Sequence, residues 1–172
     1  MCSQCESAKT SEIVAILFNI AAVHKAIGES DKALDAFLKV LHHERDLHQR
    51  EGSTFDAKDL ILTLMHIFEI YDREFGIPRD GMEYLLEAAT LCREYNKSID
   101  NTLGRYVFFL LGDVLSSNQE TTEGFKCYCE GCKLFGTMDT DDILAFGKKG
   151  VHMILAQMCN DNRVFPVHAA AA

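Results

Sequence analysis

The stretch "SEIVAILFNIAAVHKAIGESDKALDAFLKVLHHERDLHQREG", residues 11–52, decides the fold of this chain. Apolar residues recur at helical spacing through its first half, which predicts an amphipathic helix with Ser11 as its N-cap. The second half has the same spacing, and Asp31 is its candidate cap. Gly28 leaves only a short turn between the halves, so the two helices must pack antiparallel. The stretch therefore predicts a helical hairpin.

The same pattern recurs along the chain. We expect two more hairpins and a closing helix, at about residues 56–97, 102–136 and 140–160. We expect residues 1–10 to form a flexible N-terminus and residues 161–172 a tail. The predicted fold is all-α. It is an α-solenoid of about three antiparallel hairpins, plus a C-terminal capping helix, in one domain over 11–160.

An internal repeat supports this arrangement. When the second helices of the hairpins are superposed, a small residue recurs at the expected tight crossing, as Ala33, Gly81 and Gly124. A larger residue follows one turn later in each helix, as in Phe37 and Tyr128. Small residues let paired helices approach closely, while the larger ones fill the space between hairpins.

These residues resemble the tetratricopeptide repeat family over roughly residues 11–135. The first hairpin carries the resemblance at seven positions. The family usually has there, in order, a large residue, Leu, a small residue, an aromatic residue, Gly, Ala and an aromatic residue. In this chain these positions are Leu17, Ile20, Ala21, His24, Gly28, Ala33 and Phe37. The second hairpin, at about residues 56–97, fits the family pattern only if one extra residue is allowed before Gly81. The long second helices are similar to the longer-repeat branch, as in kinesin light chains and the Leu-Gly-Asn-repeat adaptors.

The resemblance implies a concave groove lined by the first helix of each hairpin, which binds a peptide or helix of another protein. Carried over position by position, the groove residues are Phe18, Asn19, Ala22 and Lys25, then Met65, His66, Glu69 and Arg73, then Tyr106, Phe109, Leu110 and Asp113. In the longer-repeat branch an asparagine at the place of Asn19 hydrogen-bonds the peptide backbone. The competing interpretation is that the apolar members are buried against the terminal helix, Asp141–Met158.

The groove lacks the features of the family members that bind a C-terminal carboxylate. Those members use a Lys and Asn set, whereas the matching places here include Glu69 and Asp113, which would repel a carboxylate. The sequence therefore predicts a non-catalytic interaction module of the adaptor, scaffold or assembly-subunit type. Self-association, or docking into a larger complex through the ends or convex faces of the repeats, is an alternative.

Composition excludes several other classes. The net charge of −9 argues against nucleic-acid binding, because phosphate contacts need clustered Lys and Arg. The longest apolar stretches are too short and too amphipathic for membrane insertion, and residues 1–12 have no secretory signal pattern. We expect a cytoplasmic protein with mostly free thiols among its seven cysteines.

The clustered cysteines of "FKCYCEGCKLF", residues 125–135, raise the alternative of a small zinc- or redox-active helical protein. At about 100° per residue, Cys127 and Cys129 point to nearly opposite sides of a helix, so three sulfurs cannot converge on one metal. We therefore expect no metal or other cofactor. His42 and Asp46 have metal-ligand spacing, but a solvated helix face explains them better. The chain has no phosphate loop or nucleophile motif, and we expect no enzymatic activity.

Overall fold

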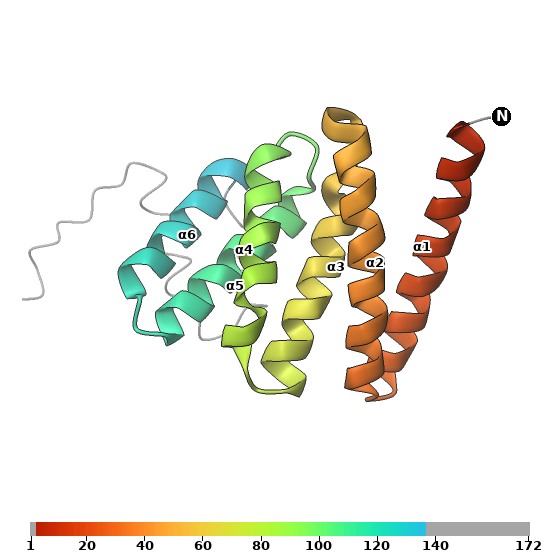
Figure 1. Cartoon of the computed structure of the whole chain (residues 1–172). Helices are drawn as coiled ribbons and strands as arrows, with labels where there is room; N and C mark the ends of the chain where they lie inside the picture. The colour runs from red at the N-terminus through yellow and green to blue at the C-terminus, as the bar shows by residue number, and fades with distance from the viewer. Residues whose placement is uncertain (1–2, 137–172) are drawn as a thin grey trace, which may run out of the picture. The chain divides into compact units, whose positions relative to one another are not determined.

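The structure is a computed structural model that describes residues 3–136, with side chains from Glu12 onward except that of Ser53. Every regular element in this range is helical (Figure 1): α1 Ser3–Ala26, α2 Ser30–Glu51, η1 Gly52–Thr54, α3 Ala57–Glu69, η2 Ile70–Glu74, α4 Pro78–Glu94, α5 Asn101–Ser117 and α6 Thr121–Phe135. The all-α prediction is confirmed for these residues. The expected closing helix, 140–160, and the tail, 161–172, lie outside them. None of the described helices combines the length and apolarity that a membrane span requires.

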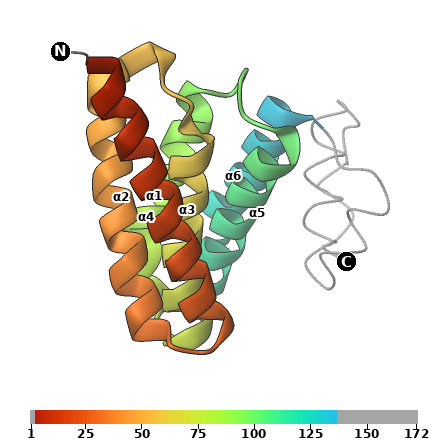
Figure 2. The ribbon, with the colours of Figure 1, turned by 90° about the vertical axis from the view of Figure 1, so that its right-hand side faces the viewer.

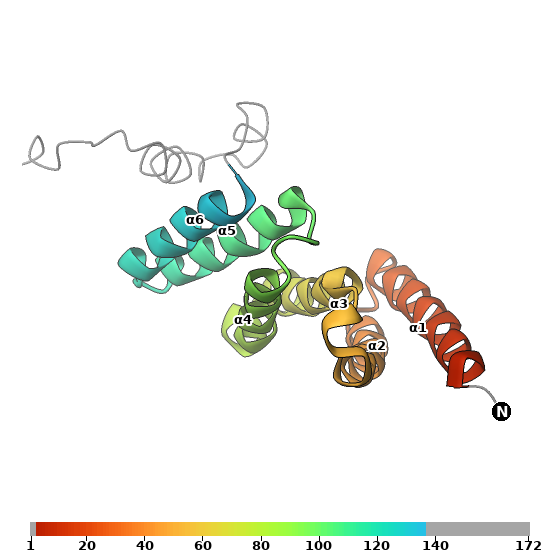
Figure 3. The ribbon, with the colours of Figure 1, turned by 90° about the horizontal axis from the view of Figure 1, so that it is seen from above.

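The chain divides into two compact units, Met1–Leu91 and Cys92–Ala172. The first unit contains α1, α2, α3 and most of α4, and consecutive helices in it run antiparallel, with α3 between α2 and α4 (Figures 1 and 3). The second contains the end of α4 and the antiparallel pair α5 and α6 (Figure 2). The helices that the sequence pairs into hairpins are therefore neighbours within each unit.

The first hairpin differs from the prediction at its helix starts. Helix α1 begins at Ser3, so residues 3–10 are helical where we expected a flexible segment ending at a Ser11 cap. No glycine or proline interrupts the chain there, and helix propagation through such a stretch costs little. Helix α2 begins at Ser30, so Asp31 lies in its first turn rather than at the cap. There its negative charge interacts favourably with the helix dipole. Gly28, at φ 79°, makes the expected short turn.

A π-helical turn explains the extra residue in the second hairpin. After α3 the chain continues into η2, where Phe75 N–H donates to Ile70 O over 3.1 Å in the five-residue spacing of a π-helix. A π turn absorbs one residue without breaking the helix. The sequence of the second hairpin matched the other hairpins only with one extra residue before Gly81. The π turn accommodates such a residue.

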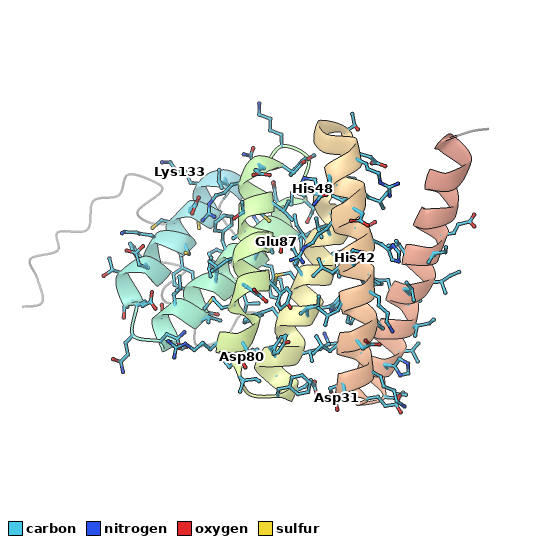
Figure 4. The ribbon with its side chains drawn as sticks, viewed as in Figure 1. Asp31, His42, His48, Asp80, Glu87 and Lys133 are labelled. Atoms are coloured by element: carbon cyan, nitrogen blue, oxygen red, sulfur yellow. The ribbon has the colours of Figure 1, made fainter. Side chains whose placement is uncertain are left out.

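Small residues stand where the helices approach closely, as the repeat predicted. A Cβ atom added to Gly81 of α4 would lie 2.8 Å from Tyr71 Cβ on η2. One added to Gly124 of α6 would lie 2.6 Å from Gly112 O on α5. Helix α4 is also joined to α2 by an ion pair, in which Arg45 Nε donates to Glu87 Oε1 over 3.0 Å (Glu87 is labelled in Figure 4).

Candidate functional site

Four of the predicted groove residues form one contact cluster on the face shared by α1 and α3. Lys25 Nζ donates to Glu69 Oε2 over 2.6 Å and lies 3.2 Å from His66 Nδ1. The same His66 nitrogen lies 3.6 Å from Glu69 Oε2, so the three polar side chains meet at one point. The His66 ring stacks on Phe37 at 5.1 Å and lies 5.6 Å from the ring of Phe18. We call this face, with its cluster Phe18, Lys25, His66 and Glu69, the α1–α3 face.

The remaining predicted groove residues of the first unit have different environments. Asn19 is exposed on α1, Ala22 is half-buried, and Arg73 is exposed on η2. Met65 is buried at 3% exposure and belongs to the core of the unit rather than to its surface. Asn19 and Arg73 are therefore accessible, Ala22 is partly accessible, and the methionine is not.

In the second compact unit, which contains α5 and α6, two of the four predicted groove residues take part in the packing of α5 against α6. Phe109 is 2% exposed and packs against Tyr128 and Cys132, with the Phe109 and Tyr128 ring centroids 5.8 Å apart. Asp113 Oδ1 accepts a hydrogen bond from the Tyr128 hydroxyl at 2.5 Å. Tyr106 and Leu110 are half-buried. The accessible part of the predicted set thus lies mainly in the first unit.

A cavity of about 440 Å³ adjoins the α1–α3 face. Helices α1, α2 and α3 and the turn before α3 line it, with Val14, Ala15, Phe18, Asn19, Glu44, Leu47, Glu51, Phe55, Asp56, Asp59 and Leu62. Phe18 belongs to both the cavity and the contact cluster, so the two are continuous. The volume lies within the range of pockets that hold small ligands or anchoring side chains.

Glu44 is the residue of this site that the sequence interpretation missed. We expected a solvated helix face at His42 and Asp46, and His42 is indeed solvated, with 76% of its side chain exposed (Figure 4). Glu44, however, is only 3% exposed. It lies on the buried side of α2 one turn after Val40, so its place in the apolar helical period was the signal that could have identified it.

Burial controls the ionisation of Glu44. Desolvation raises the pKa of its carboxyl to about 7, and the neighbouring charge of Asp59 adds to the rise. The Thr63 hydroxyl opposes this rise in part, yet neither that hydroxyl nor Glu44 Oε2 has a hydrogen-bond partner of good geometry. A buried polar atom without a partner is uncommon in folded proteins and costs stability.

The cysteines of α6 behave mainly as packing residues. Cys127 and Cys132 are buried, while Cys129 is half-buried. Burial raises the pKa of the Cys127 thiol, and it raises that of Cys92 to about 12, so both stay protonated and unreactive near neutral pH. Among the side chains that the structure describes, no group of three or more His, Cys, Asp or Glu is placed to hold a metal ion. The side chains of Cys2, Cys5 and Cys159 lie outside that set.

Comparisons with known proteins add no assignment. No family model, no curated protein and no solved structure matches this chain. A function for this chain therefore has to be inferred from the geometry of the α1–α3 face and its cavity.

Proposed function

We propose that this protein is a non-catalytic interaction module and that the α1–α3 face binds a peptide or helix of a partner protein. The observation that carries the proposal is the continuity between this face and the cavity. Phe18 joins them, and Asn19 stands exposed at the cavity wall. An aromatic anchor beside a pocket, with polar groups around it, is the usual composition of a peptide-binding surface.

The polar cluster gives this face a fixed shape. Lys25 and Glu69 are paired and largely shielded, with 23% and 16% of their side chains exposed. A pair held in this way loses little conformational freedom when a ligand covers it, which favours binding. The tetratricopeptide-like repeat pattern of the sequence supports the same kind of function.

A random peptide library displayed on phage and selected against the whole chain tests this proposal. We expect the selected peptides to bind the Asn19→Ala/Ala22→Glu variant at least about tenfold more weakly than wild type, because one change removes a hydrogen-bonding amide and the other places a charge on the face. Gln49→Ala, which removes an exposed amide from α2, is the matched control and should bind normally. Equal binding to all three proteins, with the double variant folded, would contradict the proposal.

A second function, self-association, is favoured by a different face of α1. Five branched apolar residues, four on α1 and one directly after its end, are 44–64% exposed at alternating three- and four-residue spacing: Ile13, Ile16, Ile20, Val23 and Ile27. This is the spacing of a seam between packed helices. We call these residues the α1 stripe. A second copy of the chain presents the same stripe and is the occupant that fits it, because a two-fold contact pairs like with like.

A further inference from the structure

The polar side chains that line the cavity beside the α1–α3 face are neutral or acidic. They are one amide and four carboxylates: Asn19, Glu44, Glu51, Asp56 and Asp59. Of the described residues that line this cavity, none is Lys, Arg or His. Asp56 caps α3 by accepting from Lys58 N–H at 3.1 Å, while Glu51 and Asp59 line the cavity and are exposed. Such a concentration of negative charge attracts cations.

Glu44 supplies an independent indication of a ligand. It lines the cavity, is 3% exposed, and its Oε2 atom has no hydrogen-bond partner among the described residues. An ionised carboxylate in this position is costly unless a cation pairs with it. A cationic group bound in the cavity would provide the missing partner, and the exposed carboxylates of Glu51 and Asp59 line the same cavity.

The walls of the cavity favour a guanidinium group over a compact cation. The apolar lining includes the rings of Phe18 and Phe55 and the side chain of Leu47. A guanidinium is weakly hydrated, stacks on aromatic rings and pairs with a carboxylate through two parallel hydrogen bonds. Its aliphatic stem can lie along apolar walls. An ammonium keeps its water more tightly and gains less from such a site.

We infer that this cavity receives an arginine side chain of the bound peptide, with the guanidinium on the Glu44 carboxyl and the stem between Phe18 and Leu47. The inference rests on the proposed function, since it names the residue of the partner that the α1–α3 face selects. Arginine binding requires Glu44 to give up its proton, so affinity rises with pH through the neutral range. Glu51, Asp56 and Asp59 face the same cavity, and the ring of His48 lies 5.0 Å from that of Phe55.

The test is an NMR titration of the whole chain with Nα-acetyl-arginine methylamide, and in parallel with the lysine and citrulline analogues. We expect the arginine compound to shift the amide signals of the cavity residues and to bind at least about tenfold more tightly than citrulline, its uncharged isostere. Glu44→Gln should weaken arginine binding by a similar factor and remove its pH dependence. Glu83→Gln, on the exposed side of α4, removes the same charge and should change nothing. Asp59→Asn is a second cavity variant and should weaken binding without altering the core.

The outcomes separate this inference from the proposed function. Loss of arginine binding in Glu44→Gln but not in Glu83→Gln supports the inference. No arginine binding, while selected peptides still bind the α1–α3 face, overturns the arginine site and leaves the function standing. Lysine binding as tightly as arginine overturns the choice of a guanidinium. Selected peptides that lack arginine, and that bind Glu44→Gln as well as wild type, also overturn it.

Discussion

At the scale of single residues, the burial of Glu44 makes the stability of the fold depend on pH. In the unfolded chain its carboxyl ionises around the usual value of 4.5, whereas in the fold burial raises its pKa to about 7. Between these two values the folded protein binds a proton that the unfolded chain has already lost. Unfolding therefore releases a proton there, and the free energy of unfolding falls as pH rises.

We expect the protein to be less stable at about pH 8 than at about pH 5 by up to about 3 kcal/mol from this residue. Glu44→Gln keeps the size of the side chain but cannot ionise, so it should remove this loss and exceed wild type in stability at the higher pH. Urea unfolding of both proteins across this range measures the effect. The difference between the two curves isolates Glu44 from other groups, and parallel curves would contradict a raised pKa.

Gly124 is the second residue whose surroundings predict a measurable effect. A Cβ atom there would lie 2.6 Å from Gly112 O and even closer to Ser116 Oγ. Gly124→Ala should therefore push α6 away from α5 and cost about 1–3 kcal/mol, despite the better helix propensity of alanine. Thr122→Ala, an exposed change in the same helix, should stay within about 0.5 kcal/mol of wild type in chemical unfolding. A Gly124→Ala protein as stable as wild type would show that these helices can separate at no cost.

At the scale of elements, the π turn of η2 is the feature that departs from regular geometry. Its Phe75 to Ile70 hydrogen bond spans one residue more than in an α-helix. Deleting exposed Arg73 gives η2 the length of a regular α-helical turn before the chain bends at Gly76. The side chains on both sides of the deletion keep their faces.

We expect the deletion of Arg73 to leave a folded, cooperative protein, with a loss of no more than about 2 kcal/mol. Deletion of Lys39, which is equally exposed but lies inside α2, should unfold the first unit, because every later residue of that helix would turn by about 100°. Far-UV circular dichroism with urea titration compares the two. Equal damage from both deletions would mean that η2 does not hold a spare residue.

The sequence predicted the helices and their pairing because both follow from a repeated apolar period and from glycine turns such as Gly28. It failed at the start of α1, where the apolar period ends near Ile13 but nothing stops the helix.

The sequence predicted Phe18, Lys25, His66 and Glu69 as members of one face, since equivalent positions of neighbouring hairpins lie side by side. It offered burial of the apolar members only as a competing interpretation, and only against the terminal helix, whereas Met65 is buried in the core of the first unit and Phe109 packs against Tyr128 of α6. It also missed Glu44, because charged residues are assigned to the surface by default.

At the scale of the whole molecule, the α1 stripe is the surface on which the proposed self-association rests. Contiguous exposed apolar surface of this kind is uncommon on monomeric proteins and usually marks a contact with another protein. All five stripe residues are β-branched, which suits the seam of a helical assembly.

We expect size-exclusion chromatography with light scattering to find a dimer or a higher oligomer that dissociates on dilution. Ile16→Lys/Val23→Lys should give a folded monomer, because two charges cannot be buried in the seam. Lys126→Ala, an exposed change on α6, is the control and should leave the oligomeric state unchanged. A wild-type monomer at high concentration would rule out self-association through the stripe, and peptide binding at the α1–α3 face would be unaffected by that result.

The π turn also bears on how this hairpin tolerates a change of length. An insertion inside a regular helix rotates every later side chain by about 100°. Here the extra residue is confined to Ile70–Glu74, and Gly81 still meets Tyr71 at the helix crossing. A change of one residue in the length of this hairpin can therefore be absorbed while its packing contact persists.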